Sequence, residues 1–312
     1  MKTELNYINL SYHTHSQKEY HIPLTYQIFG KDLFTAPIIL INHALTGNSN
    51  ASGEKGWWKQ LVGENQVVDT NKYTVLCFNI PGNGYDDFLI EDYEDFTPSD
   101  IANIFLKGLE ALHIKNLYAI IGGSLGGGIA WEMLTKQPEL AEIFIPIACD
   151  YRTHDWLHAQ CLVQKFLLNS QDEPLQKARI HAMLCYRTPQ SLNNRFQNQY
   201  NQEKQCLQSE DWLIYHGNAL NERFSLKAYR LMNHLLMNIN ADDTALDKIQ
   251  ARMHMISVDT DLFFPASEIR TCFENLKEKK ENISYHEIQS IHGHDAFLME
   301  YQQLNNIIKN IL

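Results

Sequence analysis

One stretch decides the fold, and it reads Leu117-Tyr118-Ala119-Ile120-Ile121-Gly122-Gly123-Ser124-Leu125-Gly126-Gly127. An apolar run typical of a buried strand leads into a G-x-S-x-G sequence, and residues with helical spacing follow up to Pro138. Glycines around a serine permit the tight, strained turn that lifts a hydroxyl out of the end of a sheet. A phosphate-binding loop would carry a lysine after the glycines, and none follows here. We therefore predict that Ser124 is a nucleophile on a strand-to-helix turn.

A nucleophilic serine of this kind needs amide groups that stabilise a developing oxyanion. The helix N-terminus behind Ser124 favours negative charge, so the backbone amide of Leu125 is one expected donor. The second donor is expected in the loop after the apolar run 37–41, which reads Asn42-His43-Ala44-Leu45-Thr46-Gly47. The amide of Leu45 or that of Thr46 suits this role, and we select Leu45. His43 is expected to be a packed loop residue and not a catalytic base.

The pattern around this stretch predicts an α/β protein. Short apolar runs alternate with helical stretches at residues 37–41, 74–78, 117–121, 143–148, 253–258 and 283–288. Such runs indicate a mostly parallel sheet that helices cover on both faces. Residues 7–12 and 20–28 alternate in polarity and predict an opening antiparallel hairpin. Thr97 and Pro98 mark the start of one of the covering helices.

The stretch from 151 to 245 interrupts the strand pattern. It reads as helical, and no strand run is evident in it. We therefore predict an α/β-hydrolase fold in which residues 1–150 and 246–312 form the core and residues 151–245 form an inserted helical cap. In this fold the acid and the histidine of a catalytic triad follow the serine along the chain, each after a late strand.

Two loops offer the triad partners of Ser124. The loop after the run 253–258 contains Asp259 and Asp261, and we choose Asp261 as the acid, with Asp259 as a loop-capping residue. Asp150, after an earlier strand, is a more remote candidate. The loop after the last strand holds two competing histidines, His292 and His294. The acid would hold the imidazole in one tautomer and stabilise its cationic form.

Composition narrows the function classes. The net charge of -11 opposes binding to phosphate backbones and to anionic membranes, so we expect neither nucleic acid nor membrane as a partner. The N-terminal residues 1–17 lack an apolar core of signal-peptide length. Six scattered cysteines without a C-x-x-C pair indicate reduced thiols. Together these features predict a cytoplasmic protein.

At this point several segments resemble the homoserine O-acetyltransferase family of methionine biosynthesis, over most of the chain. The resembling segments are His43-Ala44-Leu45-Thr46-Gly47, Gly56-Trp57-Trp58 leading to Gly63, Gly122 to Gly127, Asp261-Leu262-Phe263-Phe264-Pro265, Gly293-His294-Asp295-Ala296-Phe297-Leu298, and in the cap Ala178-Arg179, Tyr186-Arg187 and Arg195-Phe196. The resemblance favours His294 over His292. The Trp-Trp segment is more specific than any serine turn.

The resemblance also implies a substrate site. The substrate-binding arginine of the family falls on Arg179 and its substrate-binding aspartate on Asp295. A hydroxy amino acid such as homoserine carries a carboxylate and an ammonium, so one cation and one anion near the serine suit it. The implied reaction uses acyl-CoA as co-substrate and needs no metal or bound cofactor. The resemblance further implies a homodimer built through the cap.

The chain departs from the family pattern after Phe78-Asn79. A stretch similar to G-G-C-x-G-S-T-G-P is usual there, whereas this chain has Ile80-Pro81-Gly82-Asn83-Gly84-Tyr85-Asp86-Asp87-Phe88. It is also shorter than typical members. Three functions therefore compete: acyl transfer to a hydroxy amino acid, hydrolysis by the same triad with water as acceptor, and binding by a non-catalytic relative. The intact Ser, Asp and His set argues against the last.

Overall fold

The computed structural model describes residues 4–312, so the first three residues of the segment considered for a signal peptide lie outside it. Its centre is an eight-stranded sheet in the order β1-β2-β6-β3-β7-β8-β11-β12. The strands are β1 (Asn6–His13), β2 (Glu19–Gly30), β3 (Ile38–Asn42), β6 (Thr74–Phe78), β7 (Leu117–Gly123), β8 (Ala141–Ile147), β11 (Arg252–Val258) and β12 (Ile283–Ile288).

Strand pairing confirms the predicted α/β-hydrolase fold with its mostly parallel sheet. β1 pairs with β2 and β2 with β6 in antiparallel fashion, which also confirms the opening hairpin. Every other neighbouring pair in the sheet is parallel. The predicted runs match the strands closely, with β3 beginning and ending one residue later than the run 37–41.

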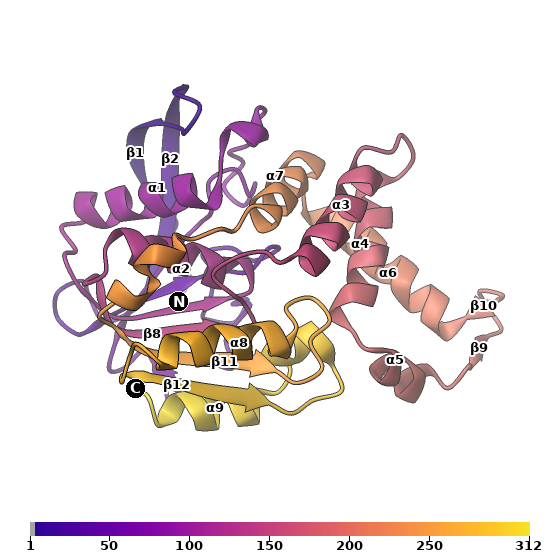
Figure 1. The fold of residues 1–312 in the computed structure, drawn as a ribbon. Helices are drawn as coiled ribbons and strands as arrows, with labels where there is room; N and C mark the ends of the chain where they lie inside the picture. The colour runs from indigo at the N-terminus through magenta and orange to yellow at the C-terminus, as the bar shows by residue number, and fades with distance from the viewer. Residues whose placement is uncertain (1–3) are drawn as a thin grey trace.

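Helices and loops cover both faces of the sheet (Figure 1). In β3, Ile38 and Leu40 join one buried cluster while Ile39 and Ile41 join the other, because successive side chains point to opposite faces. The first cluster includes buried residues of α1 (Pro98–Ala111), α2 (Leu125–Lys136) and α8 (Ala266–Lys277). The second includes those of α9 (Tyr301–Lys309) and of the two-stranded sheet formed by β4 (Val62–Gly63) and β5 (Val68–Asp69).

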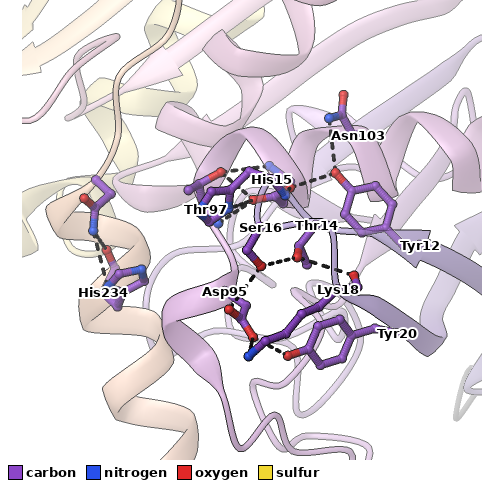
Figure 2. A network of polar contacts seen from close by, with 12 residues as sticks. Tyr12, Thr14, His15, Ser16, Lys18, Tyr20, Asp95, Thr97, Asn103 and His234 are labelled. Carbon is purple, nitrogen blue, oxygen red and sulfur yellow. Dashed lines mark hydrogen bonds and ion pairs between the residues drawn. The ribbon is translucent and has the colours of Figure 1, made fainter.

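The start of α1 is fixed as the sequence predicts. Thr97 caps the helix in a reciprocal capping box with Asp100, and Pro98 occupies the first turn. Asp100 also accepts a hydrogen bond of 2.9 Å from the Tyr12 hydroxyl and one of 3.0 Å from the His15 amide. Figure 2 shows this polar network, which ties the tip of the β1–β2 hairpin to the N-terminus of α1.

The segment between β8 and β11 is mainly helical. It contains α3 (Asp155–Leu168), α4 (Pro174–Tyr186), α5 (Pro189–Phe196), α6 (Gln208–Arg223) and α7 (Leu226–Met237), and α3 to α6 project from one end of the sheet (Figure 1). The expectation that this segment holds no strand is wrong. β9 (Tyr200–Asn201) and β10 (Cys206–Leu207) form an antiparallel pair. Two-residue strands are too short to produce an alternating pattern.

Three short 3₁₀ helices complete the chain: η1 (Tyr93–Asp95), η2 (Asp243–Lys248) and η3 (Gly293–Leu298). All six cysteines are free thiols, and four of them are buried. Across residues 4–312, every helix is too short or too polar to cross a bilayer.

Candidate active site

The backbone of Ser124 is strained, as a serine on a strand-to-helix turn requires. Its φ of 53° and ψ of -127° lie outside the regions that a serine normally adopts. The turn places Ser124 between the last residue of β7 and the first residue of α2. A Cβ on Gly122 would lie 2.6 Å from the carbonyl oxygen of Gly126, so only glycine fits at that position. The local sequence therefore enforces the turn that presents the hydroxyl.

The three residues predicted as a triad come together. His294 Nε2 lies 2.9 Å from Ser124 Oγ, and His294 Nδ1 lies 2.7 Å from Asp261 Oδ2. All three side chains are buried. With Nδ1–H donating to the carboxylate, Nε2 is free to accept the serine proton, which is the arrangement that activates a hydroxyl for attack on a carbonyl carbon.

The surrounding loops hold the acid and the histidine in place. Asp261 Oδ1 accepts the amide N–H groups of Phe263 at 2.7 Å and Phe264 at 2.9 Å. From α3, the Trp156 indole and the Gln160 amide both donate to the Leu262 carbonyl, at 2.6 and 2.8 Å. Helix α3 thus holds the loop of Asp261 in place through these two hydrogen bonds. The rings nearest to the His294 imidazole are those of Phe263, Phe264, Phe297 and Tyr186, at 4.9 to 5.8 Å.

The competing acids and histidine have other partners. Asp259 accepts the Ser290 amide at 2.9 Å, which is the loop-capping role expected for it. Asp150 is bound by His154 Nε2 at 3.0 Å. His292 Nδ1 lies 2.9 Å from the hydroxyl of Ser191. None of these contacts involves Ser124.

The backbone amides of the predicted oxyanion donors are unpaired within the described part of the chain. Within residues 4–312, the amide N–H groups of Leu45 and Leu125 donate to no protein acceptor, which leaves both available to a ligand. His43 is buried beneath the loop, with Nδ1 2.8 Å from the Ala44 carbonyl and Nε2 3.0 Å from the Ile80 amide nitrogen. Burial lowers the pKa of His43 to about 4, so the ring stays neutral and acts as a packed loop residue.

Arg179 and Asp295 both lie close to His294. The Arg179 guanidinium sits 5.5 Å over the ring of Tyr186, whose centroid is 5.7 Å from that of His294. No carboxylate of the described chain lies within ion-pair distance of Arg179. Burial raises the pKa of Asp295, and the positive charges of Arg179, His294 and Arg187 offset part of that rise. One cation and one anion thus stand beside the histidine.

Arg187 is a residue to which sequence reasoning gave no role. Its buried guanidinium lies 3.6 Å from Asp295, 3.3 Å from His292 and 3.2 Å from Ser191. An arginine so placed orients the Asp295 carboxylate and favours its ionised form, which opposes part of the effect of burial on its pKa. In the sequence, Arg187 is marked only by its place in the segment Tyr186-Arg187, one of those that resemble the homoserine O-acetyltransferase family.

Residues 4–312 contain no group of three or more His, Cys, Asp or Glu side chains arranged to hold a metal ion. The expectation of a reaction without metal or cofactor stays a prediction.

Comparisons with known proteins agree with this geometry. Residues 37–143 match the family model described as the alpha/beta hydrolase fold. A homoserine O-acetyltransferase of Methanococcus vannielii is 29% identical over 92% of this chain and 67% of its own length. A homoserine O-acetyltransferase from Bacillus anthracis superimposes with a TM-score of 0.88 at 17% identity, over 99% of this chain and 96% of that one. Esterase E22 superimposes with a TM-score of 0.87 at 18% identity, over 99% of both chains.

The sheet, the strained serine and the match over residues 37–143 show that the chain has the α/β-hydrolase fold. Its sequence relatives include homoserine O-acetyltransferases, as the resemblance of the individual segments indicates. The structural neighbours include both transferases and esterases, and they establish the fold alone.

Proposed function

We propose that this protein is an acyltransferase that moves an acyl group from acyl-CoA to the hydroxyl of homoserine or a similar hydroxy amino acid. Ser124 would carry the acyl group, His294 would move the protons, and Asp261 would orient His294. Two observations support this proposal. Hydrogen-bond distances join Ser124, His294 and Asp261, and the sequence is similar to proteins named homoserine O-acetyltransferase.

The reaction would take place in two steps. Ser124 Oγ attacks the thioester carbon while His294 takes its proton, and the carbon–sulfur bond then breaks as His294 returns the proton to CoA. In the second step the acceptor hydroxyl gives its proton to His294 and attacks the acyl-serine. The bond to Ser124 Oγ breaks, and the serine recovers the proton. The amides of Leu45 and Leu125 would stabilise the oxyanion in both steps.

One observation favours an amino-acid acceptor over water. Arg179 and Asp295 place opposite charges near His294, and no carboxylate within residues 4–312 pairs with Arg179. The carboxylate and the ammonium of a hydroxy amino acid would match this pair and bring the hydroxyl close to His294 Nε2. Water as acceptor would use neither charge.

A hydrolase with the same triad is the second candidate. The stretch 80–88, where the chain departs from the family pattern, and the equally good superposition of an esterase favour it. The two candidates differ in what accepts the acyl group.

The test is the release of CoA, measured with and without homoserine, in the wild type and in Arg179→Ala. For a transferase we expect homoserine to accelerate steady-state release. Arg179→Ala should raise the KM for homoserine about ten- to a hundredfold, the cost of one charge-assisted hydrogen bond, and leave the first burst of CoA unchanged. Turnover that is independent of homoserine and unaltered by Arg179→Ala would exclude the transferase and leave the hydrolase.

A further inference from the structure

A second arginine contacts the oxyanion loop. Arg223 is the last residue of α6, and its Nη1 donates to the carbonyl oxygen of Thr46 at 3.5 Å. Thr46 follows Leu45, the predicted oxyanion donor. Arg223 is thus one residue removed from the amide that would hold the thioester oxygen. It approaches that loop from the helical segment and not from the sheet.

The guanidinium of Arg223 is not neutralised by the protein. No carboxylate within residues 4–312 lies at ion-pair distance from it. An arginine carries five N–H donors, and the bond to Thr46 uses one of them. The side chain is exposed, yet the surrounding protein displaces enough water to lower its pKa. It is therefore a cation with free donors and a partly desolvated charge.

Arg179 strengthens this conclusion. Its positive charge lowers the pKa of Arg223 further, so the two guanidinium groups repel each other. Neither has a carboxylate partner within residues 4–312, although the chain carries 37 acidic residues and only 26 basic ones. A bound anion between or near two arginines that repel each other would stabilise both charges.

We propose that Arg223 binds an anionic group of the acyl donor. This inference rests on the proposed function, in which Arg179 serves the acceptor. The anionic group has two chemical sources: a carboxylate at the far end of a dicarboxylic acyl chain, or a phosphate of CoA. Both present oxygen atoms that a guanidinium binds through paired hydrogen bonds. Bound there, the anion would draw the donor toward the Leu45 amide and offset the repulsion between the two arginines.

The test compares three thioesters: acetyl-CoA, succinyl-CoA and the acetyl thioester of N-acetylcysteamine, which has neither phosphate nor carboxylate. The rate of serine acylation and its KM are measured for the wild type, Arg223→Gln and Arg223→Lys. Arg252→Gln is the control, because Arg252 is an exposed arginine at the start of β11, the end of the strand remote from the loop of Asp261.

We expect Arg223→Gln to raise KM about ten- to a hundredfold for the anionic donors and to leave the N-acetylcysteamine thioester unaffected. An effect on succinyl-CoA alone assigns the carboxylate, and an equal effect on both CoA thioesters assigns the phosphate. Arg223→Lys should recover part of the loss. Unchanged KM values would overturn the proposal. So would an equal loss with all three thioesters, because Arg223 would then act only through Thr46.

A binding measurement separates this proposal from the proposed function. CoA and succinate are titrated by calorimetry into the wild type and into Arg223→Gln, without any turnover. Weaker binding of either ligand by the variant supports the anion site even if no acyl group is transferred. Identical binding of both would contradict it even if the enzyme proves to be a transferase.

Discussion

His43 Nε2 accepts the backbone amide of Ile80 at 3.0 Å, and this bond joins the oxyanion loop to the stretch 80–88. The side-chain amide of Asn83 lies 3.3 Å from the same nitrogen, and on the other side of the ring Nδ1 lies 2.8 Å from the Ala44 carbonyl. The ring must therefore carry its proton on Nδ1. A neutral, buried histidine thus connects the oxyanion loop to residues 80–88, where the sequence departs from the family pattern.

The first prediction follows from this bond. His43→Ala should lower kcat for acylation by about ten- to a hundredfold with little change in KM, because a misplaced Leu45 amide weakens only the transition state. His43→Gln can still accept from Ile80 and should recover part of the rate. Since the pKa of His43 is about 4, the wild-type rate should show no step from this ring above pH 5. A variant that changes KM alone would contradict the role.

The second prediction concerns the triad partners and uses neighbouring residues as controls. His294→Ala should lower turnover by roughly 10⁴-fold or more, and Asp261→Asn somewhat less, as is usual for such triads. His292→Ala and Asp259→Asn should retain most activity, since their hydrogen bonds go to Ser191 and Ser290. Steady-state kinetics of the four variants decide the point. If His292→Ala lowers turnover more than His294→Ala, the assignment of the histidine is wrong. If Asp259→Asn lowers it more than Asp261→Asn, the assignment of the acid is wrong.

The third prediction concerns stability at the start of the inserted segment. His154 Nε2 binds the buried Asp150 carboxylate at 3.0 Å, and this bond raises the pKa of His154. Glu268 raises that pKa further, whereas burial and Arg152 lower it. A raised folded-state pKa adds stability that is complete below the unfolded value of about 6.5 and is lost as the pH rises through the folded value.

Urea unfolding of the wild type and of His154→Gln at pH 6 and pH 9 checks this prediction. The variant should be less stable than the wild type at pH 6, and the difference should shrink at pH 9. His158→Gln, one helical turn further along α3 and exposed, should show no such dependence on pH. A difference between wild type and His154→Gln that is equal at both values would contradict the ionic bond.

Most of the core could be predicted because its central strands are buried on both faces and therefore read as continuous apolar runs, as in β3 and β6. The serine turn could be predicted because only glycine fits beside Ser124. The pair β9–β10 could not be predicted, because strands of two residues are too short to show an alternating pattern. The ion pair of Arg187 with Asp295 could not be predicted, because it joins the residue after α4 to η3, far along the chain, and no local pattern records such a contact.

The choice of Asp261 came from the order of elements along the chain, and that of His294 needed the family resemblance in addition. The sequence could not predict that Arg179 and Arg223 lack carboxylate partners within residues 4–312. An unpaired charge is a property of the space around a side chain, and composition alone would favour a carboxylate partner for each in an acidic protein.

The most direct test of the central claim is the intact mass of the protein after brief exposure to acetyl-CoA and to succinyl-CoA. We expect a single added acyl group in the wild type, located at Ser124 by peptide mapping and removed when homoserine is added, with O-acylhomoserine as product. Ser124→Ala should remain folded and gain no mass. An adduct that persists in Ser124→Ala, or a wild-type protein that neither donor acylates, would contradict the account.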